Sequence, residues 1–143
     1  MSIPVISAVS DIGRQKLADM LVSGRAFAIE KFVIGSGGHD PGNPVIALTP
    51  DPTLQTLPGQ YFGPKDITNS FLLSPTCPQF DCFISQLEAV GSMSNIGLIG
   101  RINYSPIPGD SLVGSYFLFA VGNFPLRVKT DAEQLTISVS IQF

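Results

Sequence analysis

The sequence has little of the side-chain chemistry on which most enzyme active sites depend. Its 143 residues include no tryptophan, one histidine and two cysteines. Because a Ser-His-Asp triad needs a histidine base, His39 is the only candidate for that role. Two cysteines cannot complete a zinc site, and Cys77 and Cys82 are not spaced as a C-x-x-C redox motif. We expect two free thiols, with a local disulfide as the alternative.

The sequence is also poor in charge. Charged residues make up 13% of the chain, about half of the roughly 25% that is typical of soluble domains. The chain has eight Lys and Arg residues and eleven Asp and Glu residues, and the basic residues form no cluster. This argues against a nucleic-acid-binding surface. Two interpretations stay open: a surface covered by partners in an assembly, or a β-surface rich in Ser, Thr, Asn and Gln.

Long apolar runs are missing as well. No run approaches the roughly 20 residues that cross a bilayer, and the N-terminus has no basic segment followed by an apolar one. We therefore expect no membrane partner and a chain that is made and kept soluble in a cytoplasm. A length of 143 residues suits one domain with a sizeable core.

The helix and strand patterns in the sequence predict an α+β fold, mainly an antiparallel β-sheet with one N-terminal helix packed on it. Residues 10–25 read as a helix, because Ser10 or Asp11 can cap its start and Gly24 can end it. Residues 135–143 alternate strictly between apolar and polar side chains, as in a strand with one buried face. We divide the single domain 1–143 into a helix-strand block at about 1–38, a docking loop at about 39–66 and antiparallel strands at about 67–143.

The middle segment is predicted to be a long Pro/Gly-rich loop. Prolines are concentrated between Pro41 and Pro64, where they oppose both helix and central strand. The segment is nevertheless too apolar for a solvated linker, so we expect it to lie against something. The predicted interface residues in and near it are Leu54, Leu57, Tyr61, Phe62 and Phe71.

The stretch VIGSGGHDPGNPV raises the possibility of an active site, and four interpretations compete. It lacks both the P-loop ending and the G-x-G-x-x-G pattern that binds phosphates. A hydrolase acting through His39 and Asp40, or a metal site on the same pair, would rest on adjacent residues that seldom align. The favoured interpretation is a turn, with no catalytic, metal-binding or cofactor-binding residue. Its structural residues are Gly35, Gly37, Gly38, Asp40, Pro41 and Pro44.

Two blocks of the sequence carry a family likeness. The first, VSDIGRQKLADMLVSGRAFAIEKFVIGSGG (9–38), has a helix, a strand and a glycine-rich exit. The second, within 95–143, has an IGL-type strand, then LFAVGNFP, a lysine and a closing alternating strand. In these blocks the chain resembles the N-terminal attachment domain of the bacteriophage tail-collar fibre proteins and related baseplate-associated tail proteins. Residues 40–90 have no counterpart that we can align.

The resemblance implies a virion structural protein without enzymatic activity. It suggests an adaptor that joins tail fibres to the baseplate, assembled in the host cytoplasm and located in the virion tail. Its partners would be other tail, baseplate or fibre proteins, and the chain would form a homo-oligomer in a three- or six-fold context. No cofactor is expected. The alternative function is a small carbohydrate- or receptor-binding β-domain of a tail tip, which predicts exposed aromatic and amide side chains on one face.

Overall fold

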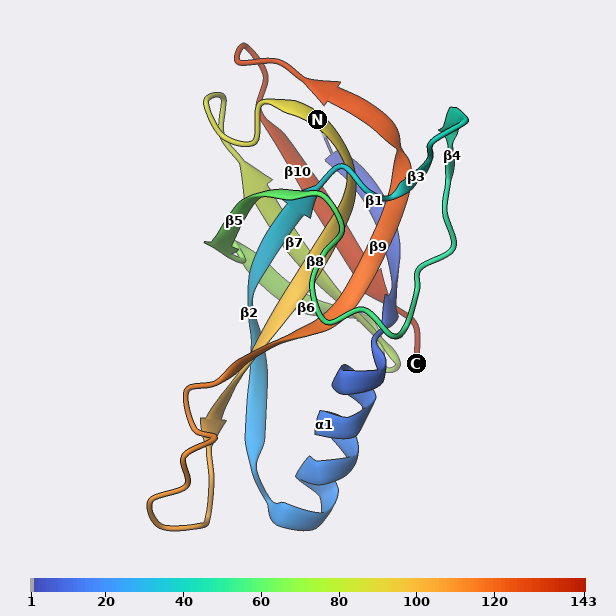
Figure 1. Cartoon of the computed structure of the whole chain (residues 1–143). Coiled ribbons are helices and arrows are strands. Elements are labelled where there is room, and N and C mark those ends of the chain that lie inside the picture. Colours follow the sequence, from blue (N-terminus) through green and yellow to red (C-terminus); the bar gives the residue numbers. More distant parts are fainter. Residues whose placement is uncertain (1) are drawn as a thin grey trace.

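The structure, a computed structural model, describes residues 2–143. They form one helix and ten strands (Figure 1). In chain order these are β1 (Ser2–Val9), α1 (Asp11–Ser23), β2 (Ala26–Gly35), β3 (His39–Asp40), β4 (Asn43–Ala47), β5 (Gln60–Asp66), β6 (Asn69–Ser74), β7 (Cys77–Ile84), β8 (Gly91–Tyr104), β9 (Tyr116–Lys129) and β10 (Leu135–Ile141). The predicted α+β class, dominated by strands, is confirmed.

Eight of the strands form one sheet in the order β5-β2-β8-β9-β1-β10-β7-β6, and β3 and β4 form a separate hairpin. Every neighbouring pair in the large sheet is antiparallel except β1 and β10, which run parallel. The sheet is therefore mixed, although it is mainly antiparallel as expected. The parallel pair joins the two ends of the chain, with Val5 opposite Val139.

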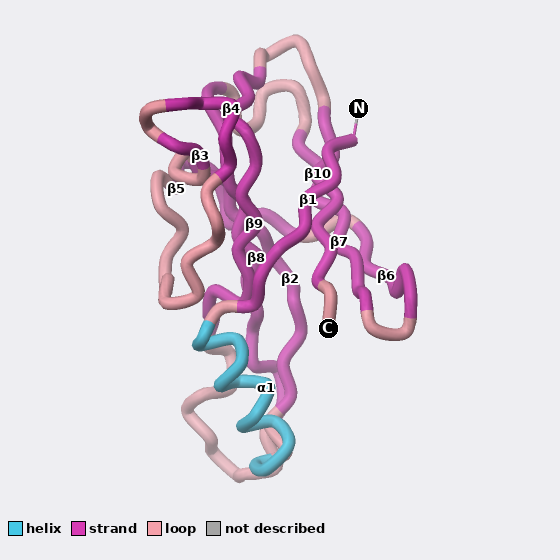
Figure 2. The backbone as a smooth tube through the Cα atoms, turned by 90° about the vertical axis from the view of Figure 1, so that its right-hand side faces the viewer, coloured by secondary structure: helices cyan, strands magenta, loops and turns pink. Residues whose placement is uncertain are grey.

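The sheet curls so that the short link between its two edge strands spans the gap between its two edges. The edge strands β5 and β6 are separated in the chain by Ile67 and Thr68 alone. The Ile67 N–H donates to the Glu30 carbonyl in β2, and the Thr68 N–H donates to the Asp81 carbonyl in β7, each at 2.9 Å. These two residues thus bridge the opposite ends of the strand order, and the molecule is an incompletely closed barrel (Figure 2).

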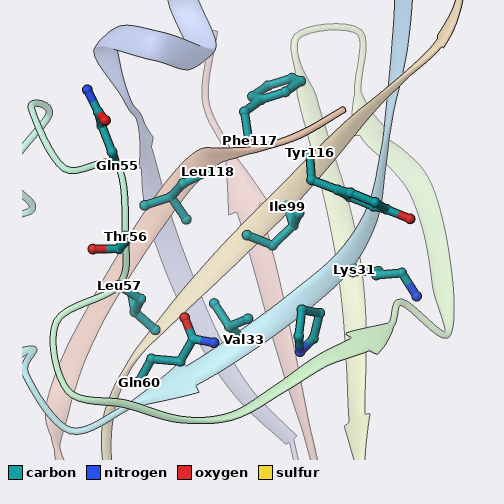
Figure 3. A pocket seen from close by; sticks show the side chains of 11 residues that line it. Lys31, Val33, Gln55, Thr56, Leu57, Gln60, Ile99, Tyr116, Phe117 and Leu118 are labelled. Atoms are coloured by element: carbon teal, nitrogen blue, oxygen red, sulfur yellow. The ribbon is translucent and has the colours of Figure 1, made fainter. Parts of the chain in front are cut away.

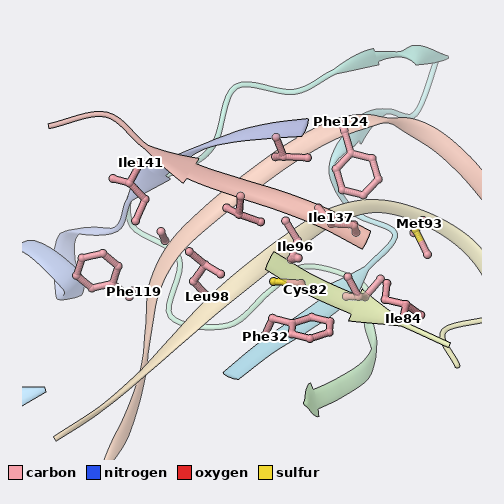
Figure 4. Close-up of a cluster of buried hydrophobic side chains, with 14 of the residues drawn as sticks. Phe32, Cys82, Ile84, Met93, Ile96, Leu98, Phe119, Phe124, Ile137 and Ile141 are labelled. Carbon is pink, nitrogen blue, oxygen red and sulfur yellow. The ribbon is translucent and has the colours of Figure 1, made fainter. Parts of the chain in front are cut away.

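The main hydrophobic core fills the inside of this curled sheet (Figure 4). Side chains from β2, β7, β8 and β10, including Phe32, Ile84, Ile96 and Ile137, are fully buried there. In β10 the alternation places Leu135, Ile137, Val139 and Ile141 inside, as the sequence predicted. Phe143 lies beyond the strand and is exposed, so it does not continue the buried face.

Helix α1 begins and ends at the predicted residues. The Ser10 hydroxyl accepts a hydrogen bond from the Gly13 N–H at 2.9 Å, and Gly24 adopts the left-handed conformation that ends the helix. The helix packs on β9, where a Cβ on Gly13 would lie 2.5 Å from the Phe119 carbonyl oxygen. Leu21, near the end of the helix, is exposed to solvent.

The structure does not show the long loop that was predicted over 39–66. Strands β3, β4 and β5 lie in this range, which leaves the two-residue turn 41–42 and residues 48–59 without a strand. The prolines that argued against strands occupy positions that tolerate them: Pro44 lies in the two-stranded hairpin and Pro64 in the edge strand β5. Neither position requires the backbone N–H of a central strand.

Both cysteines are free thiols, as expected. They lie five residues apart on β7, so their side chains point to opposite faces of the strand. Cys82 is fully buried in the core, and burial raises the pKa of its thiol well above the usual range. A thiol in this setting serves as a packing group.

Candidate functional site

A groove of about 540 Å³ lies on the outer face of the sheet, opposite the main core (Figure 3). Its floor is formed by Val33 of β2, Ile99 of β8 and Leu118 of β9, three neighbouring strands of the sheet. The segment 54–60 forms one wall. The remaining lining residues are Lys31, Gln55, Thr56, Leu57, Gln60, Pro64, Tyr116 and Phe117.

Strand alternation explains why apolar side chains gather outside the barrel. In β2, Phe32 and Ile34 point into the main core, so Val33 between them points outward. Val33 and Leu118 form a second buried cluster with Leu57, which is only 4% exposed. The apolar floor is therefore partly covered by the chain itself, and the groove is the part that remains open.

Hydrogen bonds from the sheet and from the start of helix α1 hold the covering segment 48–59 in place. The side-chain amide of Asn123 donates to the Leu48 carbonyl at 2.9 Å, and that of Asn95 donates to the Pro58 carbonyl at 3.1 Å. Near the middle, the Asp11 N–H donates to the Pro52 carbonyl at 2.7 Å. Fixed at these points, the segment gives the groove a preformed wall.

The rim of the groove is polar. The Lys31 ammonium lies 2.7 Å from the Asp66 carboxylate, and this hydrogen bond raises the pKa of Lys31. The Tyr116 ring is about half exposed, and the guanidinium of Arg101, the residue opposite Tyr116 on β8, lies 5.6 Å from its centroid. A flat ring beside amide and hydroxyl groups can bind a ligand that combines apolar patches with hydrogen-bonding groups.

The predicted turn residues connect β2 to the β3–β4 hairpin. Gly35 ends β2, and Pro41 lies in the turn between β3 and β4. Gly38 packs so closely that a Cβ there would lie 2.1 Å from the Ser94 carbonyl oxygen. The Asp40 carboxylate accepts a hydrogen bond from the Gly42 N–H at 2.9 Å, a local arrangement typical of turns.

The structure gives His39 and Asp40 separate contacts. His39 Nδ1 lies 2.9 Å from the hydroxyl oxygen of Ser94, which also accepts a hydrogen bond from the Gly38 N–H. Ser94 is fully buried. The Asp40 carboxylate therefore belongs to the turn between β3 and β4, whereas the His39 imidazole contacts strand β8. Within residues 2–143, no three His, Cys, Asp or Glu side chains are grouped as metal ligands.

The five predicted interface residues do not form one surface. Leu57 is buried in the wall of the groove, and Leu54 packs beside it. On β5, Phe62 packs against the main core, whereas Tyr61 is 42% exposed and donates its hydroxyl hydrogen to the Ala89 carbonyl. Phe71 lies apart from these on β6 and is 41% exposed.

The prediction missed the neighbours of Phe71. All six residues of β6 are exposed, and Leu72 and Leu73 are more exposed than Phe71. The signal in the sequence that could have indicated their exposure is the run Phe71-Leu72-Leu73. Successive residues of a strand point to opposite faces, so three consecutive apolar residues cannot all be buried against one core.

Comparisons with family models, with curated proteins and with solved structures found no match to this chain. In the part of the chain that the structure describes, no helix is long and apolar enough to cross a membrane.

Proposed function

We propose that the protein is a structural component of a bacteriophage tail, an adaptor between tail fibres and the baseplate that has no enzymatic activity. The observation that carries the proposal is the exposure of apolar side chains on several separate segments of a charge-poor chain. Such residues occur on β6, on the β3–β4 hairpin (Val45, Ile46) and at the end of α1 (Leu21, Val22). Separate apolar areas suit a subunit with several neighbours.

The family resemblance supports the same proposal. The first block supplies α1, β2 and the turn after it, and the second supplies most of β8, β9 and β10. Strands β2, β8 and β9 are neighbours in the sheet. The resemblance therefore falls on three neighbouring strands of the sheet and on β10, which only β1 separates from them.

The location of the chain in particles tests this proposal. Immunogold labelling of purified virions, or their reconstruction by cryo-electron microscopy, should place the protein at the junction of fibres and baseplate. Its partners there would be tail, baseplate or fibre proteins and further copies of itself, assembled in the host cytoplasm. Absence of the chain from purified particles would contradict the proposal.

The groove favours a second candidate, a carbohydrate- or receptor-binding β-domain. The exposed ring of Tyr116 lies in the same groove as the amides of Gln55 and Gln60 (Figure 3). Sugar rings stack on aromatic faces, and their hydroxyls bond to amides. Under this candidate the purified chain binds glycans on an array, and Tyr116→Ala lowers binding at least ~10-fold, which is a loss of about 1.4 kcal/mol.

Tyr104 provides the matched control for that experiment. Its side chain is similarly exposed, but it lies outside the groove at the end of β8. Tyr104→Ala should leave glycan binding unchanged. An array on which the wild-type chain binds nothing, or an equal loss in the two variants, would contradict the carbohydrate candidate.

A further inference from the structure

Two cationic side chains lie on the same face of the sheet as the floor of the groove. Lys31 is opposite Ile99, and Ile99 is opposite Leu118, so these three form one row across β2, β8 and β9. Arg101 and Tyr116 are opposite each other two residues further along β8 and β9, and the pairing between the two rows is regular. Because alternate residues of a strand share a face, Arg101 continues the face that Ile99 contributes to the groove.

Arg101 is a cation without an acidic partner. Within residues 2–143 its guanidinium forms no ion pair, and its Nε is buried and makes no hydrogen bond. The contact with the Tyr116 ring involves the positive charge of the guanidinium. Buried N–H donors are nearly always paired in folded proteins, and the guanidinium group pairs especially well with anions. An anionic group beside Tyr116 can serve as the acceptor for Arg101.

Lys31 brings a second positive charge to this end of the groove. Its ammonium is paired with Asp66, but the Asp66 side chain is largely exposed. Ion pairs at the surface contribute little, so an anion can share the ammonium with Asp66. Glu30, the neighbour of Lys31 in the chain, lines a different pocket. Two cations and one carboxylate at this end leave an excess of positive charge, although the whole chain has a net charge of −3.

The opposite end of the groove is apolar. Val33 lies two residues from Lys31 on β2 and is buried in one cluster with Leu57. Figure 3 shows Leu57 and Val33 toward one end of the groove, and Tyr116 and Lys31 toward the other. The volume of about 540 Å³ lies within the range of roughly 300 to 1,000 Å³ that is typical of small-molecule sites. The groove therefore runs from an apolar wall to a cationic end.

We propose that the groove binds a small amphipathic anion, a molecule with an apolar body and one carboxylate or sulfonate group. The body lies on Ile99 and Leu118, where it removes apolar surface from water. The anionic group lies beside Tyr116, between Lys31 and Arg101. The excess of positive charge argues against a cationic ligand, and the apolar floor argues against a fully polar one. The inference concerns the isolated chain and depends on neither the tail proposal nor the carbohydrate candidate.

Two fluorescent probes that differ only in their charge test this inference on the native chain. Anilinonaphthalene sulfonate is an amphipathic anion that binds apolar surface. Phenylnaphthylamine has the same apolar skeleton without the sulfonate. Fluorescence titration should show binding of the sulfonate with a dissociation constant that rises with ionic strength, because salt screens its attraction to the two cations. Binding of the uncharged probe should not depend on salt.

Arg101→Gln separates the contribution of the charge from that of the apolar floor. It should raise the dissociation constant of the sulfonate at least ~10-fold and leave that of the uncharged probe unchanged. Ile99→Ala removes part of the floor, so it should weaken the binding of both probes about 3-fold. Circular dichroism checks that the variants are folded, since partly folded chains also bind the sulfonate.

Arg14→Gln is the matched control. Arg14 also forms no ion pair within residues 2–143, and it lines a separate groove of about 580 Å³ next to helix α1, together with the exposed Ile6 and Phe143. The substitution removes the same charge, and the binding of both probes should stay unchanged. A loss equal to that of Arg101→Gln would assign the binding to the groove next to α1 and overturn the inference.

Two further results would contradict the inference: a native chain that binds neither probe, or an Arg101→Gln variant that loses affinity equally for both probes. A chain that binds glycans on an array but neither probe would also overturn it and would leave the carbohydrate candidate standing. A chain that binds the sulfonate as expected but is absent from virions would contradict the tail proposal alone.

Discussion

The two edge strands of the large sheet, β5 and β6, end the same sheet in opposite ways. On β5, Lys65 donates a hydrogen bond to the Phe83 carbonyl at 2.9 Å and forms an ion pair with Glu88, and the Tyr61 hydroxyl bonds to the Ala89 carbonyl. On β6, three neighbouring apolar side chains are exposed and none is charged. One edge is fastened by side chains to other parts of the chain, and the other exposes its apolar side chains.

This difference separates two kinds of residue at the edges of the sheet. The contacts of Lys65 and Tyr61 tie β5 to the end of β7 and to the segment between β7 and β8, so they help to close the barrel. The apolar residues of β6 contribute little to closing it, because they stay exposed in the single chain. Substitutions on β5 should therefore change stability more than substitutions on β6.

The largest expected effect on stability follows from Lys65→Met. The substitution removes the bond to the Phe83 carbonyl, the ion pair with Glu88 and a cation–π contact at 5.2 Å from the Phe83 ring. Because hydrogen bonds from charged groups stabilise more than neutral ones, we expect a loss of about 1 to 2 kcal/mol in the free energy of unfolding. Urea unfolding followed by circular dichroism measures it.

Leu73→Met is the matched substitution on β6, and it should change the free energy of unfolding by less than about 0.5 kcal/mol. Equal losses in the free energy of unfolding of Lys65→Met and Leu73→Met would show that the two edge strands contribute equally to the stability of the fold.

The sequence predicted those elements whose signals are local. Helix α1 has a capping serine before it and a glycine after it, and β10 has one buried and one half-exposed face over its whole length. Strand β1 was missed, although Val5 and Val9 are buried. Pro4 and the exposed Ile6 obscure its alternation, and its neighbour β10 lies at the far end of the chain.

The groove and the open edge depend on long-range pairing, which a single sequence does not reveal. Val33, Ile99 and Leu118 come together only because β2, β8 and β9 are neighbours in one register. The covering segment 48–59 was expected to lie against something, but that its partner is the chain's own sheet follows from the structure alone. Whether a strand such as β6 is central or at an edge likewise depends on tertiary structure.

A smaller effect on the stability of the fold is expected from the acid titration of Glu88. Its pKa is lowered from an ordinary value near 4.5 to about 2, first by the hydrogen bond from Lys65 and then by the Ser85 N–H. A carboxylate whose pKa is lower in the folded state stabilises the fold above its unfolded pKa. This stabilisation should fade as the pH falls from about 4.5 to about 2.

Glu88→Gln should remove that part of the pH dependence, while costing less than about 1 kcal/mol at pH 7 because the pair is partly exposed. Urea midpoints measured at pH 7, 4 and 2.5 provide the test. Leu73→Met, which changes no charge, should keep the wild-type dependence. A variant that loses stability between pH 4.5 and 2 as steeply as the wild type would assign the acid sensitivity to other carboxylates.

The smallest effect on stability should follow from Leu73→Ser. The side chain is 57% exposed in the single chain, so its removal gives up little buried area, and the free energy of unfolding should change by less than about 0.5 kcal/mol. Urea unfolding followed by circular dichroism measures this change. A variant that loses as much stability as Lys65→Met would place β6 among the elements that close the barrel, and the two edge strands would then contribute equally to the stability of the fold.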